Sequence, residues 1–184
     1  MWFDIASLLL DVSCGLVGGG CLLRWYMQWQ RVPFANPLGR LVFALTNWIV
    51  LPARRLLPSM AGWDTASLAS AWAMQLVQFS LLWLLRDMAA PYMAVIVLAS
   101  FGVLRLAISG LSGLIIAYAV LSWVQTHSPM SSVMDRLCSP LLRPLRRAIP
   151  LVGGVDLSPL VLLVAMQVLA LVVAELQRSA LAML

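Results

Sequence analysis

The stretch Pro52-Ala-Arg-Arg-Leu-Leu-Pro58 determines how this chain is organised, because it recurs as Pro144-Leu-Arg-Arg-Ala-Ile-Pro150. An aspartate follows each copy at the same distance, Asp64 after the first and Asp156 after the second. Each of these positions in the first copy has its counterpart 92 residues later, and the alignment of the two copies needs no gap. The same displacement relates Gly18 to Gly110, Tyr26 to Tyr118, Pro37 to Pro129, Gln75 to Gln167 and Arg86 to Arg178. The chain is therefore predicted to consist of two repeats.

Composition places the protein in a membrane. Hydrophobic residues make up 62% of the 184 residues, against roughly 45–50% in a soluble domain. The net charge is +5, but every basic residue is Arg, and these residues lie at the ends of long apolar runs. A nucleic-acid surface needs basic residues along a solvated face, so no nucleic-acid partner is expected. Three cysteines without C-x-x-C spacing indicate neither a disulfide framework nor a zinc site.

Four apolar segments are long enough to cross a bilayer core of roughly 30 Å. The first repeat, 1–92, contains predicted spans at about 5–27 and 65–86, and the second, 93–184, contains predicted spans at about 93–125 and 157–178. The 93–125 segment is long and is interrupted by glycines and by an arginine. One long helix is preferred there, because a hairpin would leave a first arm of about a dozen residues, short of the ~20 that a span needs.

Two further segments have the pattern of amphipathic helices, at about 37–51 and 129–143. In the first, apolar residues recur at i, i+3 and i+4 from Leu38 to Ile49. Such helices are predicted to lie in the headgroup plane. Each repeat then consists of a span, an interfacial helix, a P-x-R-R-x-x-P loop and a second span. The predicted fold class is an all-α membrane protein with four spans in two parallel repeats.

The arginines predict the orientation of the chain. Two spans per repeat return the chain to its starting side, so both Arg-rich loops face the same compartment. Most arginines lie in the two segments between paired spans, whereas the opposite side offers Arg86 and Arg178. The positive-inside bias therefore predicts cytoplasmic Arg-rich loops, with both termini on the other side.

The repeated segments resemble the two signature copies of the YggT family. The resemblance rests on Asn36-Pro37 and Ser128-Pro129, each with its downstream P-x-R-R-x-x-P, and covers nearly the whole chain. The first copy departs from the family pattern at Asn47-Trp48, where the family usually has a proline. Membership implies a bacterial inner-membrane protein with YlmG relatives in plastids and cyanobacteria. It implies links to osmotic or ion homeostasis, division and cytochrome maturation, and no enzymatic activity.

The arginine pairs suggest two roles. The guanidinium groups of Arg54-Arg55 and Arg146-Arg147 suit bidentate binding of lipid phosphates or of a carboxylate. Asp64 and Asp156 lie ten residues beyond the first arginine of each pair. Our hypothesis is an Asp–Arg contact that holds each interfacial helix against the following span. The alternative is that the arginines serve only as topology signals and anchors for anionic headgroups.

Five polar residues lie within the predicted spans, namely Asp11, Arg24, Gln75, Arg105 and Gln167. A lone charge at such a depth costs at least ~2.5–3.5 kcal/mol. Arg105 corresponds to position 13 of the first repeat, so we expect an Asp11–Arg105 ion pair, with a relay or ion path as the alternative. Repeat-equivalent Gln75 and Gln167 are expected to hydrogen-bond to each other. Arg24 is expected to extend its guanidinium to the headgroup region.

Catalytic residues are scarce. With one histidine, His127, and no lysine, a single chain cannot build a bis-His haem site, a His-based metal cluster or a Schiff base. We therefore expect no enzymatic activity, no cofactor and no metal. The preferred function is a non-enzymatic scaffold or assembly factor that binds anionic headgroups and other membrane proteins or itself. The alternative is a small oligomeric transporter or channel component that uses the polar residues within the spans as an interior path.

Overall fold

The chain is all-helical across the residues that the computed structural model describes, which are 1–57, 64–86, 88, 91–123, 129–148 and 156–184. Within these ranges the helices are α1 (Trp2–Trp29), α2 (Pro37–Leu56), α3 (Thr65–Leu85), α4 (Tyr92–Trp123), α5 (Pro129–Ala148) and α6 (Ser158–Ala182). Several residues of the sequence motifs lie outside the described residues, namely Pro58, His127, Ser128 and Pro150.

Helices α1, α3, α4 and α6 are long and apolar enough to cross a membrane. They contain 28, 21, 32 and 25 residues, and each exceeds the ~20 residues that a crossing requires. These helices coincide with the four segments that the sequence predicts as spans. Helix α4 is continuous from Tyr92 to Trp123, so the prediction of a single long helix is correct and its glycines do not divide it.

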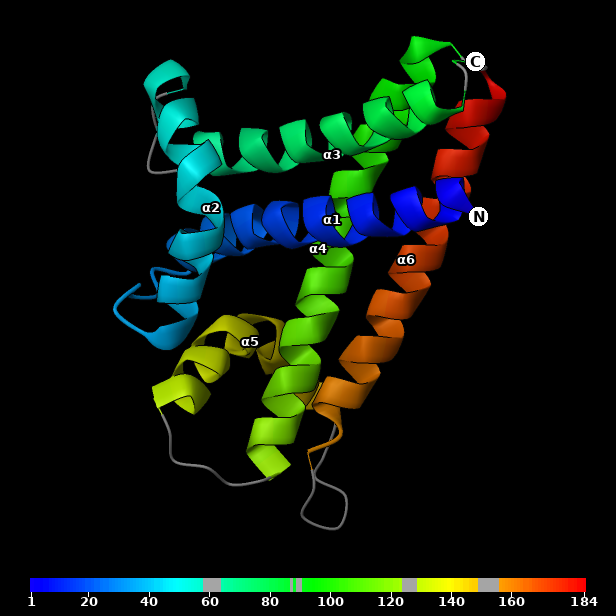
Figure 1. Cartoon of the computed structure of the whole chain (residues 1–184). Helices are drawn as coiled ribbons and strands as arrows, with labels where there is room; N and C mark the ends of the chain where they lie inside the picture. The colour runs from blue at the N-terminus through cyan, green and yellow to red at the C-terminus, as the bar shows by residue number, and fades with distance from the viewer. Residues whose placement is uncertain (58–63, 87, 89–90, 124–128, 149–155) are drawn as a thin grey trace.

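The four long helices form two antiparallel pairs that cross each other (Figure 1). Helix α1 packs against α3, α4 packs against α6, and both α1 and α3 contact α4 where the pairs cross. In the view of Figure 1 the first pair runs across and the second runs down, so the pairs diverge toward α2 and α5. Both chain termini lie at the converging end. Long helices such as α1 and α4 accommodate a tilted crossing of the bilayer.

Helix α2 starts at a capping signal and ends at the arginine pair. Asn36 Oδ1 accepts a hydrogen bond from the Gly39 backbone N at 2.9 Å, and Pro37 occupies the first turn, where its missing N–H costs nothing. Gly39 is needed there because a Cβ would collide with the Phe34 backbone. The helix continues through Pro52, so both arginines lie in its last turn. The prediction that a loop begins after residue 51 is therefore wrong for Pro52 to Arg55, which are helical.

Helix α5 has the same length as α2, 20 residues, and also ends on its arginine pair. It contains Pro140 and Pro144, each of which removes one helical N–H donor. Arg146 and Arg147 lie in the last turn, where cations interact favourably with the C-terminal carbonyl groups. The prediction that this helix ends near residue 143 is also wrong, because the helix continues through Pro144 to Ala148.

Glycines let the helices approach closely around the crossing. A Cβ on Gly18 would lie 3.0 Å from Leu106 Cδ2, and one on Gly20 would lie 3.1 Å from Thr46 Cγ2. Gly102 of α4 leaves room for the side chain of Gln75 on α3. Small residues of this kind permit close packing between helices in lipid. The packing brings α1, α2 and α3 together around a buried polar cluster.

Candidate functional site: a buried arginine and aspartate cluster

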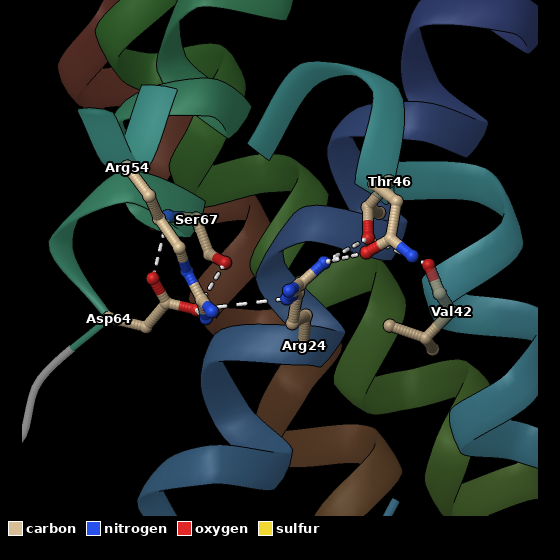
Figure 2. Close-up of polar contacts among 7 residues, drawn as sticks. Arg24, Val42, Thr46, Arg54, Asp64 and Ser67 are labelled. Atoms are coloured by element: carbon tan, nitrogen blue, oxygen red, sulfur yellow. Dashed lines mark hydrogen bonds and ion pairs between the residues drawn. The ribbon is translucent and has the colours of Figure 1, made fainter. Parts of the chain in front are cut away.

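Asp64 caps the N-terminus of α3 from a buried position (Figure 2). Its carboxylate accepts hydrogen bonds from the Ser67 backbone N at 3.3 Å and from Ser67 Oγ at 2.7 Å. Arg54 Nη2, in the last turn of α2, donates to Asp64 Oδ2 at 2.6 Å. The structure therefore brings together the first Asp–Arg pair of the sequence hypothesis, and the contact joins α2 to α3.

Arg24 of α1 completes the cluster. It is 3% exposed, and its Nη1 donates to Thr46 Oγ1 at 3.1 Å and to Asn47 Oδ1 at 2.8 Å, both on α2. Its Nε lies 3.7 Å from Asp64 Oδ2, and its guanidinium carbon lies 4.7 Å from the centre of the Phe43 ring. Arg24 was expected to extend its guanidinium to the headgroup region, and the structure shows that the guanidinium is covered by α2, which supplies its hydrogen-bond partners.

The cluster holds two cations around one anion. Burial raises the pKa of Asp64, but the hydrogen bonds from Arg54 and Ser67 outweigh this effect and hold the pKa below its usual value. Asp64 is therefore ionised at neutral pH. The Nε of Arg24 has no hydrogen bond among the described residues, so its compensation comes from the ion pair with Asp64. Removal of the aspartate would leave a buried arginine without a counter-charge.

The second Asp–Arg pair also forms, but it is more open. Arg146 Nε donates to Asp156 Oδ2 at 2.8 Å, and the two side chains are 35% and 26% exposed. Arg146 Nη2 also donates to Tyr118 OH, and the Ser158 backbone N donates to Asp156 Oδ1 at 2.9 Å. The residue 92 positions after Arg24 is Ile116, so this pair has no equivalent of the buried arginine. The two sites differ in burial and in charge.

The second arginine of each motif does not join these pairs. Arg55 and Arg147 are exposed, and neither makes a hydrogen bond or ion pair with any residue that the structure describes. Their guanidinium groups are therefore available to an outside anion, such as a phosphate. Within each motif, the first arginine contacts the protein and the second is open to the surroundings.

The polar residues within the spans make contacts that differ from the expected ones. Gln78 Nε2 donates to Asp11 Oδ1 at 2.5 Å, and Gln75 Nε2 donates to Gln78 Oε1 at 3.3 Å. Arg105 and Gln167 are exposed. The expected Asp11–Arg105 ion pair and Gln75–Gln167 hydrogen bond are both wrong, since neither is formed between these described residues. The reason is that α3 contacts both α1 and α4 and supplies the partners of Asp11 and Gln75 itself.

An apolar groove, termed here the α1–α4 groove, opens between α1, α2 and α4. Its volume is about 420 Å³. Its walls include Gly15 and Gly19 of α1, Leu41 and Leu45 of α2, and Gly110 and Gly113 of α4. None of the residues of the Arg24–Asp64–Arg54 cluster lines it, and neither do Asp11 or Gln75. The groove suits an apolar partner surface.

The polar groups of the cluster act between helices of this chain. The cluster supplies guanidinium donors and one ionised carboxylate, which hold helices together through charge-assisted hydrogen bonds. In the part of the chain that the structure describes, no three His, Cys, Asp or Glu side chains gather to hold a metal ion. Cys14, Cys21 and Cys138 are unpaired and buried.

Comparison with known proteins assigns the family. A family model described as CCB3/YggT matches residues 3–85 and 97–177, which include both Asp–Arg pairs. The chain belongs to the CCB3/YggT family. The resemblance inferred from the sequence motifs is thus confirmed.

Relatives in this family match over most of their length. The uncharacterized protein YggT of Escherichia coli K12 is 35% identical over 156 residues, which cover 84% of this chain and 81% of that protein. An uncharacterized protein in the proC 3′ region of Vibrio alginolyticus is 31% identical over 166 residues, 89% of this chain and 88% of that protein. The uncharacterized protein PA0392 of Pseudomonas aeruginosa is 31% identical over 156 residues, 83% and 79% of the two chains. No solved structure matches the chain.

The sequence did not predict several residues that hydrogen-bond to the candidate site residues, namely Thr46, Asn47, Ser67, Gln78 and Tyr118. Ser67 lies three residues after Asp64, which is the spacing of a capping hydrogen bond, and this signal was available. Gln78 lies three residues after Gln75, which places both amides on one face of α3. No comparable signal identifies Thr46 and Asn47 as partners of Arg24, because the packing of α2 on α1 creates those contacts.

Proposed function

We propose that this protein is a non-enzymatic scaffold or assembly factor of the bacterial inner membrane. The observation that carries the proposal is the α1–α4 groove of about 420 Å³, whose walls are mostly glycines and leucines. Such a surface fits a transmembrane helix, because small residues allow close approach and leucines supply contact area. The polar side chains of Asp11, Gln78 and Gln75 hydrogen-bond to one another instead of lining it.

The scaffold is proposed to consist of two parallel repeats. Three observations support this: α2 and α5 begin and end 92 residues apart, an arginine in the last turn of each pairs with an aspartate ten residues later, and the family model matches one stretch in each half. Both termini lie at one end of the molecule, as parallel repeats of two spans require (Figure 1). In this arrangement α2 and α5 are interfacial helices on the same side of the membrane.

The side that carries α2 and α5 is proposed to be cytoplasmic. Arg55 and Arg147 are exposed there and bind anionic headgroups. A dual reporter fused after Leu184 tests the orientation. We expect activity only from the reporter enzyme that functions in the periplasm. Activity only from the enzyme that functions in the cytoplasm would contradict the proposal.

Partner binding is the decisive test of the scaffold. Gly110→Leu fills the α1–α4 groove at a position where a Cβ meets no atom within 4 Å. We expect proteins cross-linked to the wild type in native membranes to be lost from this variant. The matched control, Leu171→Ala, alters an exposed position on α6 and should retain them. The identity of those proteins would also assign the process, whether osmotic or ion homeostasis, division or maturation of a membrane complex.

A transporter or channel component is the second candidate. The observation that favours it is the chain of hydrogen bonds from Asp11 through Gln78 to Gln75 between α1 and α3. Purified protein in liposomes separates the two candidates. Ion flux that Asp11→Asn abolishes would support transport, whereas absence of flux together with a reproducible cross-linked partner supports the scaffold.

A further inference from the structure

Arg105 is a cation near the middle of α4 that has no partner among the described residues. It lies thirteen residues after the first residue of the helix and eighteen before the last. Its side chain is exposed, and it makes no hydrogen bond, ion pair or ring contact with any residue that the structure describes. An uncompensated arginine at the middle of a membrane span is costly. A counter-charge from outside this chain would remove this cost.

The acid at a matching position is Asp11 of α1. The 92-residue displacement relates Arg105 to position 13, and α1 and α4 both begin at the end of the molecule that carries the termini (Figure 1). Asp11 is exposed, and only its Oδ1 accepts a hydrogen bond within the described chain, from Gln78. Two other acids on these long helices are already paired, Asp4 with the N-terminus and Glu175 with Arg178. Asp11 Oδ2 is left for an outside cation.

Both charges adjoin the α1–α4 groove. Asp11 lies four residues before Gly15, and Arg105 lies four residues before Ser109, and both of these small residues line the groove. On an α-helix this spacing places each charge one turn from the groove wall on the same face. A Cβ on Gly15, Gly110 or Gly113 would meet no atom within 4 Å, so the wall is open to an approaching helix.

We propose that a second copy of this chain docks on the α1–α4 face, with Arg105 of each copy against Asp11 of the other. A two-fold dimer makes this contact twice, so that neither charge remains alone in the membrane. An acyl chain would fill the groove but would bring no counter-charge at this depth. The proposal deepens the scaffold function, on which it rests for the use of the groove as a docking surface.

Cross-linking tests the geometry without disturbing either charge. Val12 and Leu104 adjoin Asp11 and Arg105 and are 61% and 51% exposed. One tagged copy carries Val12→Cys and a differently tagged copy carries Leu104→Cys, both in a background with the native cysteines changed to alanine. We expect a disulfide between the two tags after mild oxidation of native membranes. The matched control, Leu171→Cys on α6, is 71% exposed and should form none. Equal cross-linking of the control, or none between Val12 and Leu104, overturns the proposal.

Charge variants test the cause. Asp11→Asn keeps the Oδ1 acceptor for Gln78 but removes the charge, and Arg105→Gln removes the cation. Each should weaken dimerisation in lipid bilayers by about tenfold or more, which corresponds to at least 1.4 kcal/mol. The double variant Asp11→Arg with Arg105→Asp should restore it. Unchanged dimerisation of both single variants overturns the proposal.

The outcome for the dimer can be separated from the outcome for the scaffold. A wild-type chain that is monomeric in bilayers but still cross-links to a different protein would overturn the dimer and leave the scaffold standing. A dimer that binds no other protein would support this inference and contradict the scaffold.

Discussion

Arg24 Nε lies 3.7 Å from Asp64 Oδ2, and both residues are almost fully buried, at 3% and 1% exposed. The same carboxylate accepts a hydrogen bond from Arg54. One aspartate therefore compensates two arginines and joins α1, α2 and α3. The second half of the chain has Ile116 at the position that corresponds to Arg24, so Asp156 does not compensate a second, buried arginine there.

Asp64→Asn should destabilise the protein far more than Asp156→Asn. Loss of Asp64 leaves Arg24 buried without a counter-charge, and removal of one partner from a buried ion pair costs about 3–5 kcal/mol. The Arg146–Asp156 pair is 35% and 26% exposed, so solvent screening limits its loss to about 1 kcal/mol. Thermal unfolding in a mild detergent, followed by tryptophan fluorescence, measures both. Equal losses for the two variants would contradict the assigned role of Arg24.

Charge reversal should distinguish the two pairs in a second way. Arg146→Asp with Asp156→Arg should recover most of the stability lost in either single variant, because no third buried charge lies beside this pair among the described residues. Arg54→Asp with Asp64→Arg should not recover, because the new arginine would lie beside Arg24. Protein levels in membranes and melting temperatures of the six variants provide the readout. Failure of the Arg146–Asp156 swap to rescue would show that this contact does not hold α5 to α6.

Gly102→Ala should destabilise the crossing of α3 and α4, whereas Gly110→Ala should not. A Cβ at Gly102 would collide with the Gln75 side chain and lie 2.9 Å from Phe79 Cε2. Overpacking of this kind costs about 1–3 kcal/mol. Gly110 lies in the same helix, but its Cβ would meet no atom within 4 Å. Melting temperatures in detergent compare the two, and similar values for both variants would contradict the close packing at Gly102.

Local signals predicted where α2 and α5 begin, but not where they end. Pro37 and Pro129 mark the starts of α2 and α5 because capping and first-turn preferences act within a few residues. The predicted ends, near residues 51 and 143, come before the observed ends at Leu56 and Ala148. In the structure Pro52 and Pro144 lie within the final turns, and the arginines that follow stay helical.

Among the candidate sites, contacts between residues near in sequence were easier to predict than contacts between distant ones. The Arg54–Asp64 and Arg146–Asp156 pairs are ten residues apart, and a short connection limits where the aspartate can lie. Asp11 and Arg105 were expected to meet because they share a depth. Helix α1 does contact α4, but a shared depth does not determine which side chains meet, and Asp11 contacts Gln78 of α3 instead.

Acid should destabilise the wild type through Asp64, and more steeply than it destabilises Asp64→Asn. The pKa of Asp64 in the folded protein is below its ordinary value of 3.8, because the hydrogen bonds from Arg54 and Ser67 outweigh burial. A carboxyl group with a lowered pKa contributes its full stabilisation above the unfolded value and loses it as the pH falls through the folded value. Stability should therefore be level from pH 7 to about 5 and decline below about 4. Melting temperatures across this range measure the effect. The Asn variant should start lower at pH 7 and lose less on acidification, because asparagine does not titrate, and parallel curves would contradict the role of Asp64.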